Sequence, residues 1–361
     1  MILTQEYLRK ASLNDLKDSL HISYKCHSKY PNLIGLKYNQ FSSPADNPIV
    51  QECRGLILDS NDNWKVIAYP FNRFFNHGEK YASNIDWKHI SAQEKLDGTL
   101  IILYFYNNEW NIATSGTPDA SGQIGNSDIT FNDYFWSISE QLGMSKSWMN
   151  SNLLHNVCYM FELTGNLNKV VVSYKEPNLT LIGARDLLTY KEICIKEIYD
   201  LFSDTKINFL KEYCFNNIND IIKTFENISP VEQEGYVIVD KQFQRIKVKN
   251  PKYILMHNMK SSISLKNILD TVRKGEYSEF ISVFPEYKKE FDDIDEKYKN
   301  LIIEVKNNFE KIKHISSRKE FAFEANKTIC PSALFCKYSN KISSFEEHFF
   351  NINIDYLLKL I

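Results

Sequence analysis

Between about residues 50 and 250, short apolar runs alternate with segments rich in Asn, Gly, Asp and Pro. The runs hold many β-branched and aromatic residues, which is typical of strands. Strands are predicted at 56–58, 100–106, 159–163, 170–174, 179–182 and 236–239, and helices at 131–143, 192–202 and 206–226. This order predicts an α+β domain of antiparallel sheets with flanking helices.

The pattern changes after Pro251, where Gly and Pro become rare and charged residues frequent. Within 298–313, apolar residues recur at steps of three and four, which predicts an amphipathic helix. A chain of 361 residues is also long for a single core. We therefore predict two domains, 1–255 with the sheets and 256–361 mainly helical.

Composition excludes several classes of protein. The net charge of −2 excludes a protein that binds polyanions such as nucleic acids through a high overall positive charge. The seven cysteines are scattered and never form C-x-x-C, which argues against a zinc site and a disulfide framework. No signal peptide or membrane-length apolar run is evident. We expect an intracellular, cytoplasmic protein without a membrane partner.

The segment Lys95-Leu-Asp97-Gly98-Thr99 is the most informative motif. A lysine two residues before Asp-Gly, followed by a hydroxyl residue, suits covalent attack on a nucleotide phosphate. The alternative is a solvated lysine beside a common turn, and the isolated motif does not decide between the two readings.

Basic and acidic residues elsewhere in the chain favour the interpretation of Lys95 as a nucleophile that attacks a nucleotide phosphate. Lys247 and Lys249 alternate in a predicted strand, so both ammonium groups should point to one face and could hold phosphate. Arg54 precedes a glycine at the start of an apolar strand and could bind phosphate or ribose oxygens. Glu162 lies inside an apolar strand and Glu234 before another, which suggests a cation, a ribose hydroxyl or hydrated Mg²⁺ as partner. The ordinary alternatives are solvent-facing side chains at strand ends.

Together these segments resemble the ATP-dependent RNA ligases of the phage tRNA-repair type, RNA ligase 1, within the covalent nucleotidyltransferase superfamily. Their order and separation agree, and the likeness extends into the helical tail. The motifs are Glu52-Cys53-Arg54-Gly55, Arg73-Phe74-Phe75-Asn76, Lys95-Leu-Asp97-Gly98-Thr99, Phe161-Glu162-Leu163, Glu234-Gly235-Tyr236-Val237 and Lys247-Val-Lys249.

The resemblance implies a nucleotidyltransferase (adenylation) domain followed by a helical domain that confers RNA or tRNA specificity. It implies ATP as AMP donor, Mg²⁺ with Mn²⁺ as an alternative, and a covalent lysyl-AMP at Lys95. The partner would be RNA with 5′-phosphate and 3′-hydroxyl ends, such as nicked tRNA, and the protein would be a monomer. The resemblance also implies a phage or virus as a source, with the protein acting in the host cell. No metal ligand is assigned. The implied ATP-site residues are Tyr38, Arg54, Arg73, Phe75, Lys95, Glu162, Glu234, Lys247 and Lys249, with catalytic support from Asp97, Arg185 and Tyr253.

Two departures from the family pattern affect phosphate binding. Residues 113–117 read Ala-Thr-Ser-Gly-Thr, where this branch usually carries a lysine, so this turn supplies no cation. Arg73 replaces the more usual lysine, which keeps the charge but changes its geometry.

Two alternatives remain open at this point. A DNA ligase or a GTP-dependent capping enzyme would normally carry an OB-fold after the paired lysines, and that fold would appear as many short strands. A non-catalytic RNA-binding protein could keep the fold without the chemistry. Substituting Lys95 separates the last alternative, because RNA binding would survive and AMP transfer would not.

Overall fold

The computed structural model describes residues 1–125, 127–168, 171–172, 174–229, 232–258, 264–278, 281 and 287–361. It divides into two compact units. The first comprises Met1–Asn39, Ser43–Asn76 and Lys80–Asn250, and the second Gln40–Ser42, His77–Glu79 and Pro251–Ile361. The main division thus falls after residue 250, five residues before the boundary expected from the sequence.

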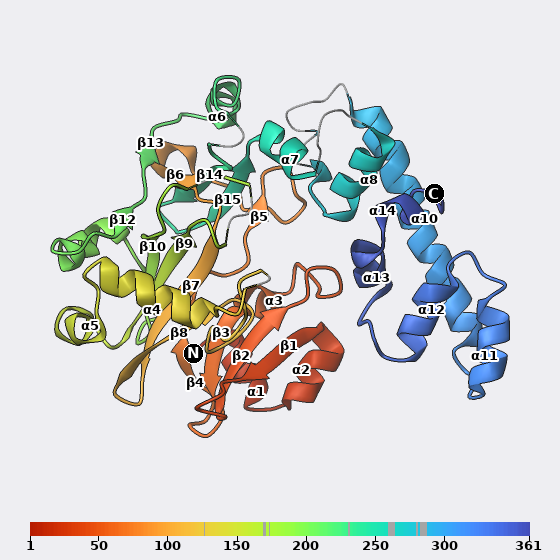
Figure 1. Ribbon diagram of the computed structural model, residues 1–361, viewed down its shortest axis with the longest axis horizontal. Coiled ribbons are helices and arrows are strands. Elements are labelled where there is room, and N and C mark those ends of the chain that lie inside the picture. The colour runs from red at the N-terminus through yellow and green to blue at the C-terminus, as the bar shows by residue number, and fades with distance from the viewer. Residues whose placement is uncertain are drawn as a thin grey trace. The chain divides into compact units, whose positions relative to one another are not determined.

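The described residues of the first unit form three sheets, whose strands are labelled in Figure 1. Nearly all strand pairs are antiparallel, and the two parallel pairs are β12 with β10 and β5 with β15. The predicted α+β class with antiparallel sheets is confirmed. In sheet order the strands are β1 (Ile22–Cys26), β2 (Leu33–Tyr38), β3 (Arg54–Asp59) and β4 (Lys65–Ala68); β11 (Glu192–Ile193), β10 (Asn178–Asp186), β9 (Val157–Thr164), β7 (Thr99–Tyr106) and β8 (Glu109–Thr114), with β12 (Asn208–Phe209) beside β10; and β13 (Glu212–Tyr213), β6 (Ile90–Lys95), β14 (Gly235–Asp240), β15 (Arg245–Lys249) and β5 (Phe75–Asn76).

Apolar side chains between the elements hold the sheets in place. In the β7–β12 sheet, buried Phe135 and Ile138 of α4 pack with Tyr159 and Phe161 of β9, and Figure 1 shows α4 lying across these strands. Thr130 caps α4 through a capping box with Asp133, which explains where this helix begins. The helices of this unit are α1 (Leu3–Leu8), α2 (Leu13–Leu20), α3 (Pro48–Glu52), α4 (Phe131–Gln141), α5 (Lys146–Asn152), α6 (Ile218–Thr224) and the 3-10 helices η1 (Trp87–His89) and η2 (Ile195–Phe202).

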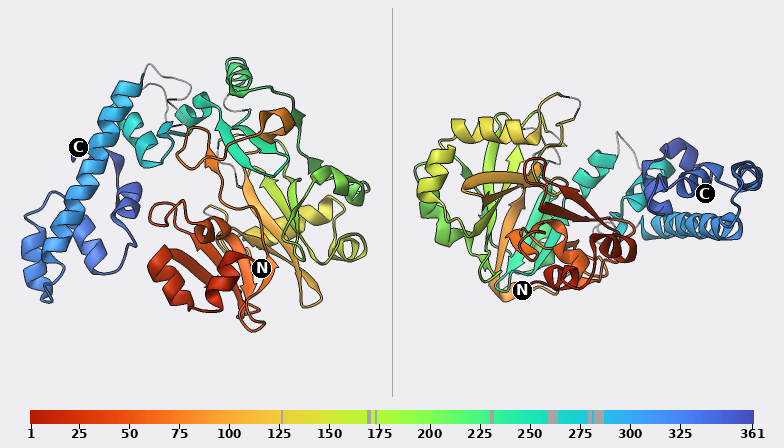
Figure 2. Two further views of the ribbon diagram at one scale, coloured as in Figure 1. Left: turned by 180° about the vertical axis from the view of Figure 1, so that it is seen from behind. Right: turned by 90° about the horizontal axis from the view of Figure 1, so that it is seen from below.

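The second unit contains helices and no strand among its described residues. The long α10 includes most of the amphipathic segment expected at 298–313, and shorter helices lie along it (Figure 2). Buried Phe291, Leu301 and Val305 of α10 pack with Phe321 and Phe349. The helices are α7 (Pro251–Asn258), α8 (Leu265–Arg273), α10 (Lys288–Ile312), α11 (Arg318–Ala325), α12 (Pro331–Tyr338), α13 (Phe345–Asn351) and α14 (Ile354–Leu357).

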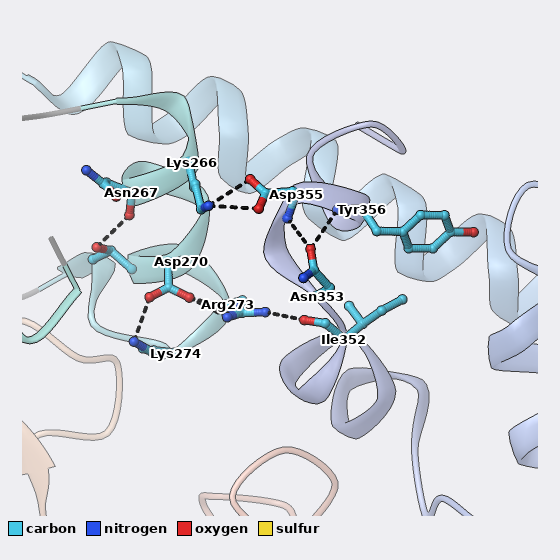
Figure 3. A network of polar contacts seen from close by, with 10 residues as sticks. Lys266, Asn267, Asp270, Arg273, Lys274, Ile352, Asn353, Asp355 and Tyr356 are labelled. Carbon is cyan, nitrogen blue, oxygen red and sulfur yellow. Dashed lines mark hydrogen bonds and ion pairs between the residues drawn. The ribbon is translucent and has the colours of Figure 1, made fainter. Parts of the chain in front are cut away.

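A polar network ties α8 to the C-terminal segment of this unit (Figure 3). Asp270 forms ion pairs of 2.6 Å with Arg273 and Lys274, and Arg273 donates a hydrogen bond of 2.9 Å to the Ile352 carbonyl oxygen. Lys266 bonds to a carboxylate of α14, that of Asp355, at 2.7 Å. These contacts fasten the end of the chain to the helical core.

Three sequence predictions of secondary structure need correction. The 206–226 segment is not one helix: β12 and β13 pair with sheet edges, and only Ile218–Thr224 is helical. The 192–202 segment begins as strand β11 and continues as a 3-10 helix. The strand expected at 170–174 is absent among its described residues, since 170 and 173 lie outside them and 171, 172 and 174 lie in bends or irregular backbone. The secondary structure of these segments is determined by pairing with other strands and by side-chain hydrogen bonds. Such contacts cannot be predicted from the local sequence pattern.

No described helix is both long and apolar enough to cross a membrane.

Candidate active site

Lys95 stands at the end of β6, where the chain leaves one sheet and enters another. It lies opposite Gly235 of β14, and the Asp97-Gly98 turn leads directly into β7. A Cβ on Gly98 would lie 2.3 Å from the carbonyl oxygen of Leu163, so only glycine allows the turn to approach β9 this closely. The motif therefore places the lysine at the junction of two sheets.

The Lys95 ammonium contacts a buried carboxylate. Its Nζ lies 2.5 Å from Glu234 Oε2, and the side chains are 22% and 6% exposed. Lys249 Nζ lies 3.9 Å from the other oxygen of the same carboxylate. Glu234 thus bridges the candidate nucleophile and a second cation.

Asp97 accepts hydrogen bonds from the backbone of the first unit at Val171 and Val172. Its Oδ2 accepts hydrogen bonds of 2.8 Å from both Val171 N and Val172 N, and its own N–H donates to Tyr174 Oη at 2.9 Å. It is buried, and it is not among the residues that line the neighbouring cavity. Its geometry indicates that it holds Val171, Val172 and Tyr174 against the motif.

Further cations surround Phe74. The Arg54 guanidinium carbon and Lys247 Nζ lie 5.1 and 5.2 Å from the centroid of the Phe74 ring. Arg54 Nη1 is buried and has no hydrogen-bond partner among the described residues. An unsatisfied buried donor of this kind fits an anionic oxygen of a ligand.

Glu162 provides a second carboxylate. Its Oε1 accepts a hydrogen bond of 3.1 Å from Gly98 N. Burial raises the pKa of Glu162 to about 7, against the opposing influence of Lys95 and Arg54. This carboxyl therefore titrates near neutral pH, as groups at functional sites often do.

A cavity of about 400 Å³ joins these groups, within the usual range for small-molecule sites. Three carboxylates line it, those of Glu94, Glu162 and Glu234. Together with the cations they fit a polyphosphate with a hydrated divalent ion, because Mg²⁺ is commonly bound by one or two carboxylates together with substrate phosphates. No group of three or more His, Cys, Asp or Glu side chains that could hold a metal occurs among the described residues. The predicted residues that line the cavity are Arg54, Lys95, Glu162, Glu234, Lys247 and Lys249.

Other predicted residues lie elsewhere. The Arg73 guanidinium stacks between Tyr38 and Phe75, with its carbon 4.5 and 5.0 Å from the two ring centroids. Arg73, Phe75 and Arg185 line a second cavity of about 600 Å³. Tyr253 is buried in α7 of the second unit. A role in ATP binding or catalysis for these residues stays a prediction.

The sequence analysis missed several residues that line the first cavity. Arg245 precedes the paired lysines by two and four positions, so strand alternation could have placed it on the same face. Its guanidinium is held by Glu192 at 2.5 Å, and Glu192 also binds Arg185 at 3.0 Å. Ile182 and Leu210 carry no signal in the sequence, because tertiary pairing alone brings them to the cavity.

Comparisons with known proteins agree with this geometry. A family model described as RNA ligase matches residues 52–253. An RNA ligase of Rhodothermus phage RM378 is 29% identical over 325 residues, which cover 74% of this chain and 73% of that protein. A protein of Autographa californica nuclear polyhedrosis virus, provisionally described as a bifunctional polynucleotide kinase/RNA ligase, is 28% identical and covers 80% of this chain, which spans 42% of that protein.

The fold also has a solved counterpart. The structure of an archaeal ATP-dependent RNA ligase, form 2, superposes with a TM-score of 0.50 at 10% identity, covering 91% of this chain and 89% of that one. At this identity the likeness concerns the fold alone. The family model, however, covers more than half of the chain. The chain therefore belongs to the RNA ligase family, as its motifs had predicted.

Proposed function

We propose that the chain is an ATP-dependent RNA ligase in which Lys95 becomes covalently linked to AMP. It joins a 5′-phosphate RNA end to a 3′-hydroxyl end. One observation carries the proposal: the Lys95 amine lines the same cavity as Arg54, Lys247 and Lys249. A nucleophile beside three phosphate-binding cations is the arrangement that covalent nucleotidyl transfer needs.

In the first step Lys95 Nζ attacks the α-phosphorus of ATP. A P–N bond forms, the bond to the bridging β-phosphate oxygen breaks, and pyrophosphate leaves. The ammonium must first lose a proton, and Glu234 Oε2 at 2.5 Å is the acceptor in contact with it. Lys247 and Lys249 are placed to stabilise the charge that develops on the phosphoryl oxygens.

Mg²⁺, or Mn²⁺ in its place, would neutralise phosphate charge when bound, and Glu162 is the residue that would hold it in hydrated form while Glu234 accepts the Lys95 proton. Glu162 must be ionised for this purpose. Because its pKa is raised to about 7, it is ionised mainly above neutral pH.

Two further transfers complete the reaction. AMP passes from Lys95 to the 5′-phosphate and forms a 5′-5′ anhydride. The 3′-hydroxyl then attacks this anhydride, AMP leaves and a phosphodiester forms. The covalent route divides one difficult displacement into easier steps.

The second unit, the RNA substrate and the oligomeric state are also part of the proposal. We assign RNA selection to the second unit and nicked tRNA as its substrate, with the enzyme acting as a monomer inside the cell. Curated relatives from a phage and a nuclear polyhedrosis virus support the idea that it is virus-encoded.

The test incubates pure protein with Mg²⁺ and α-labelled ATP, with GTP in parallel. Label from ATP should remain on denatured protein and pass into joined or circular RNA that carries a 5′-phosphate. Lys95→Ala should abolish both signals. Lys65→Ala, a lysine whose side chain is 64% exposed, is the matched control and should leave both unchanged.

Other results would favour the alternatives. Covalent label from GTP alone would indicate a capping enzyme. RNA binding without label from either nucleotide, in folded protein, would indicate a non-catalytic binding protein and reject the proposal.

A further inference from the structure

One wall of the nucleotide cavity is a turn without a cation of its own. Ser115 lines the cavity, and residues 113–117 contain no lysine or arginine. The start of β3 packs closely on this turn: a Cβ on Gly55 would lie 3.0 Å from Ser115 Cα. The Ser115 hydroxyl makes no hydrogen bond to any described residue.

Lys37 reaches this turn from a neighbouring strand. In the β2–β3 pair Lys37 stands opposite Arg54, so the two side chains leave the sheet on the same face. Lys37 Nζ lies only 3.7 Å from the position that a Cβ on Gly116 would take. Lys37 and Ser115 also line one small hollow together with Gly55. Two positions far apart in the sequence therefore meet beside Arg54.

The charge at this place is uncompensated. Lys37 and Lys25, which line the same hollow, form no ion pair with any described carboxylate. The cations on the opposite side of the cavity differ, because Lys95 and Lys249 share Glu234. Neighbouring ammonium groups without an acid repel each other, and a bound anion relieves that repulsion. The ordinary alternative is a solvated surface lysine, since Lys37 is exposed. Lys37 does not itself line the nucleotide cavity, but the hollow that it lines shares Ser115 with that cavity, and this closeness argues for the functional reading.

We propose that Lys37 supplies the missing cation of the Ser115 wall and binds the phosphate-bearing nucleotide there, next to Arg54. This inference rests on the proposed function and extends it with a specificity residue from β2. It also explains how the turn at 113–117 could bind phosphate without a lysine of its own, because the positive charge beside it comes from Lys37 on β2.

The first test measures lysyl-AMP formation as a function of ATP concentration in Lys37→Ala. A lost charge-assisted contact corresponds to roughly a tenfold or greater rise in KM for ATP. Lys65→Ala removes the same charge from β4 of the same sheet and should leave KM unchanged. Tryptophan fluorescence checks that each variant is folded.

The second test moves the charge. In Lys37→Ala combined with Ser115→Lys, the new ammonium starts from the other side of the same hollow. We expect the double variant to recover most of the lost affinity for ATP. Lys37→Ala combined with Gln141→Lys, at an exposed position at the end of α4, restores only the net charge and should recover nothing.

Several outcomes would overturn the inference. Lys37→Ala with an unchanged KM for ATP would reduce Lys37 to a surface residue. A loss confined to the sealing of pre-adenylated RNA would assign Lys37 to RNA. If Lys37→Ala combined with Ser115→Lys does not recover affinity for ATP, Lys37 and position 115 do not contribute to one site. If the wild type took no label from ATP, the proposed function itself would fail, which is a separate and distinguishable result.

Discussion

Glu162 links the stability of the first unit to pH in a way that one substitution can test. Burial raises the pKa of this carboxyl from 4.5 to about 7, while Lys95 and Arg54 oppose the shift. A shift of that size corresponds to about 3 kcal/mol as an upper value, at 1.36 kcal/mol per pKa unit. Glu162→Gln keeps the side-chain oxygen that accepts from Gly98 N but cannot ionise.

The direction of the effect follows from proton binding. The unfolded chain releases the Glu162 proton near pH 4.5, whereas the folded chain keeps it until about pH 7. The carboxyl therefore imposes no penalty below pH 4.5, and the penalty grows until the folded carboxyl has ionised, above about pH 7. Glu162→Gln should match the wild type near pH 4.5 and become more stable by up to about 3 kcal/mol near pH 8. The same variant should lose ligase activity, because it lacks the charge that would hold a hydrated metal.

Denaturant unfolding at a series of pH values measures this difference. Fluorescence reports on the first unit alone, because all five tryptophans lie within it: Trp64, Trp87, Trp110, Trp136 and Trp148. Glu140→Gln, which removes an exposed carboxylate on α4, is the matched control and should give a constant offset. If the curves of the wild type and Glu162→Gln run parallel from pH 4.5 to 8, the reasoning about burial is refuted.

Three further substitutions test other parts of the structure. Glu192→Gln removes the carboxylate between two buried arginines and should lower the free energy of unfolding by about 3–5 kcal/mol, measured by denaturant titration; a loss under about 1 kcal/mol would contradict the buried ion cluster. Gly98→Ala places a Cβ 2.3 Å from Leu163 O and should slow lysyl-AMP formation by about 100-fold in folded protein; near-normal rates would show that the turn has room to move. Asp270→Asn breaks two ion pairs of 2.6 Å, and should speed hydrogen exchange at residues 352–361 by up to about fivefold if Arg273 loses its hold on that segment; unchanged exchange would show that apolar packing alone secures it.

The sequence by itself determined the fold class and the family. Alternation and β-branched runs located most of the central strands, because residues that pack a sheet must recur with its period of two. The three-to-four spacing located α10 for the same reason. The motifs around Lys95, Glu162, Glu234 and the paired lysines were readable because their chemistry demands particular side chains close to strand ends.

Tertiary structure decided which of these residues meet. Arg54, Lys95 and Glu162 come from three different sheets and converge on one cavity, whereas Arg73 and Phe75 lie in the next cavity although they belong to an equally clear motif. Local pattern also failed at 206–226, where edge pairing with β10 and β6 replaced the expected helix. Such contacts join residues far apart in the sequence, so they depend on how the sheets pack and leave no periodic trace. The same packing brings Lys37 to a turn near residue 115. This contact could not be predicted from either segment alone.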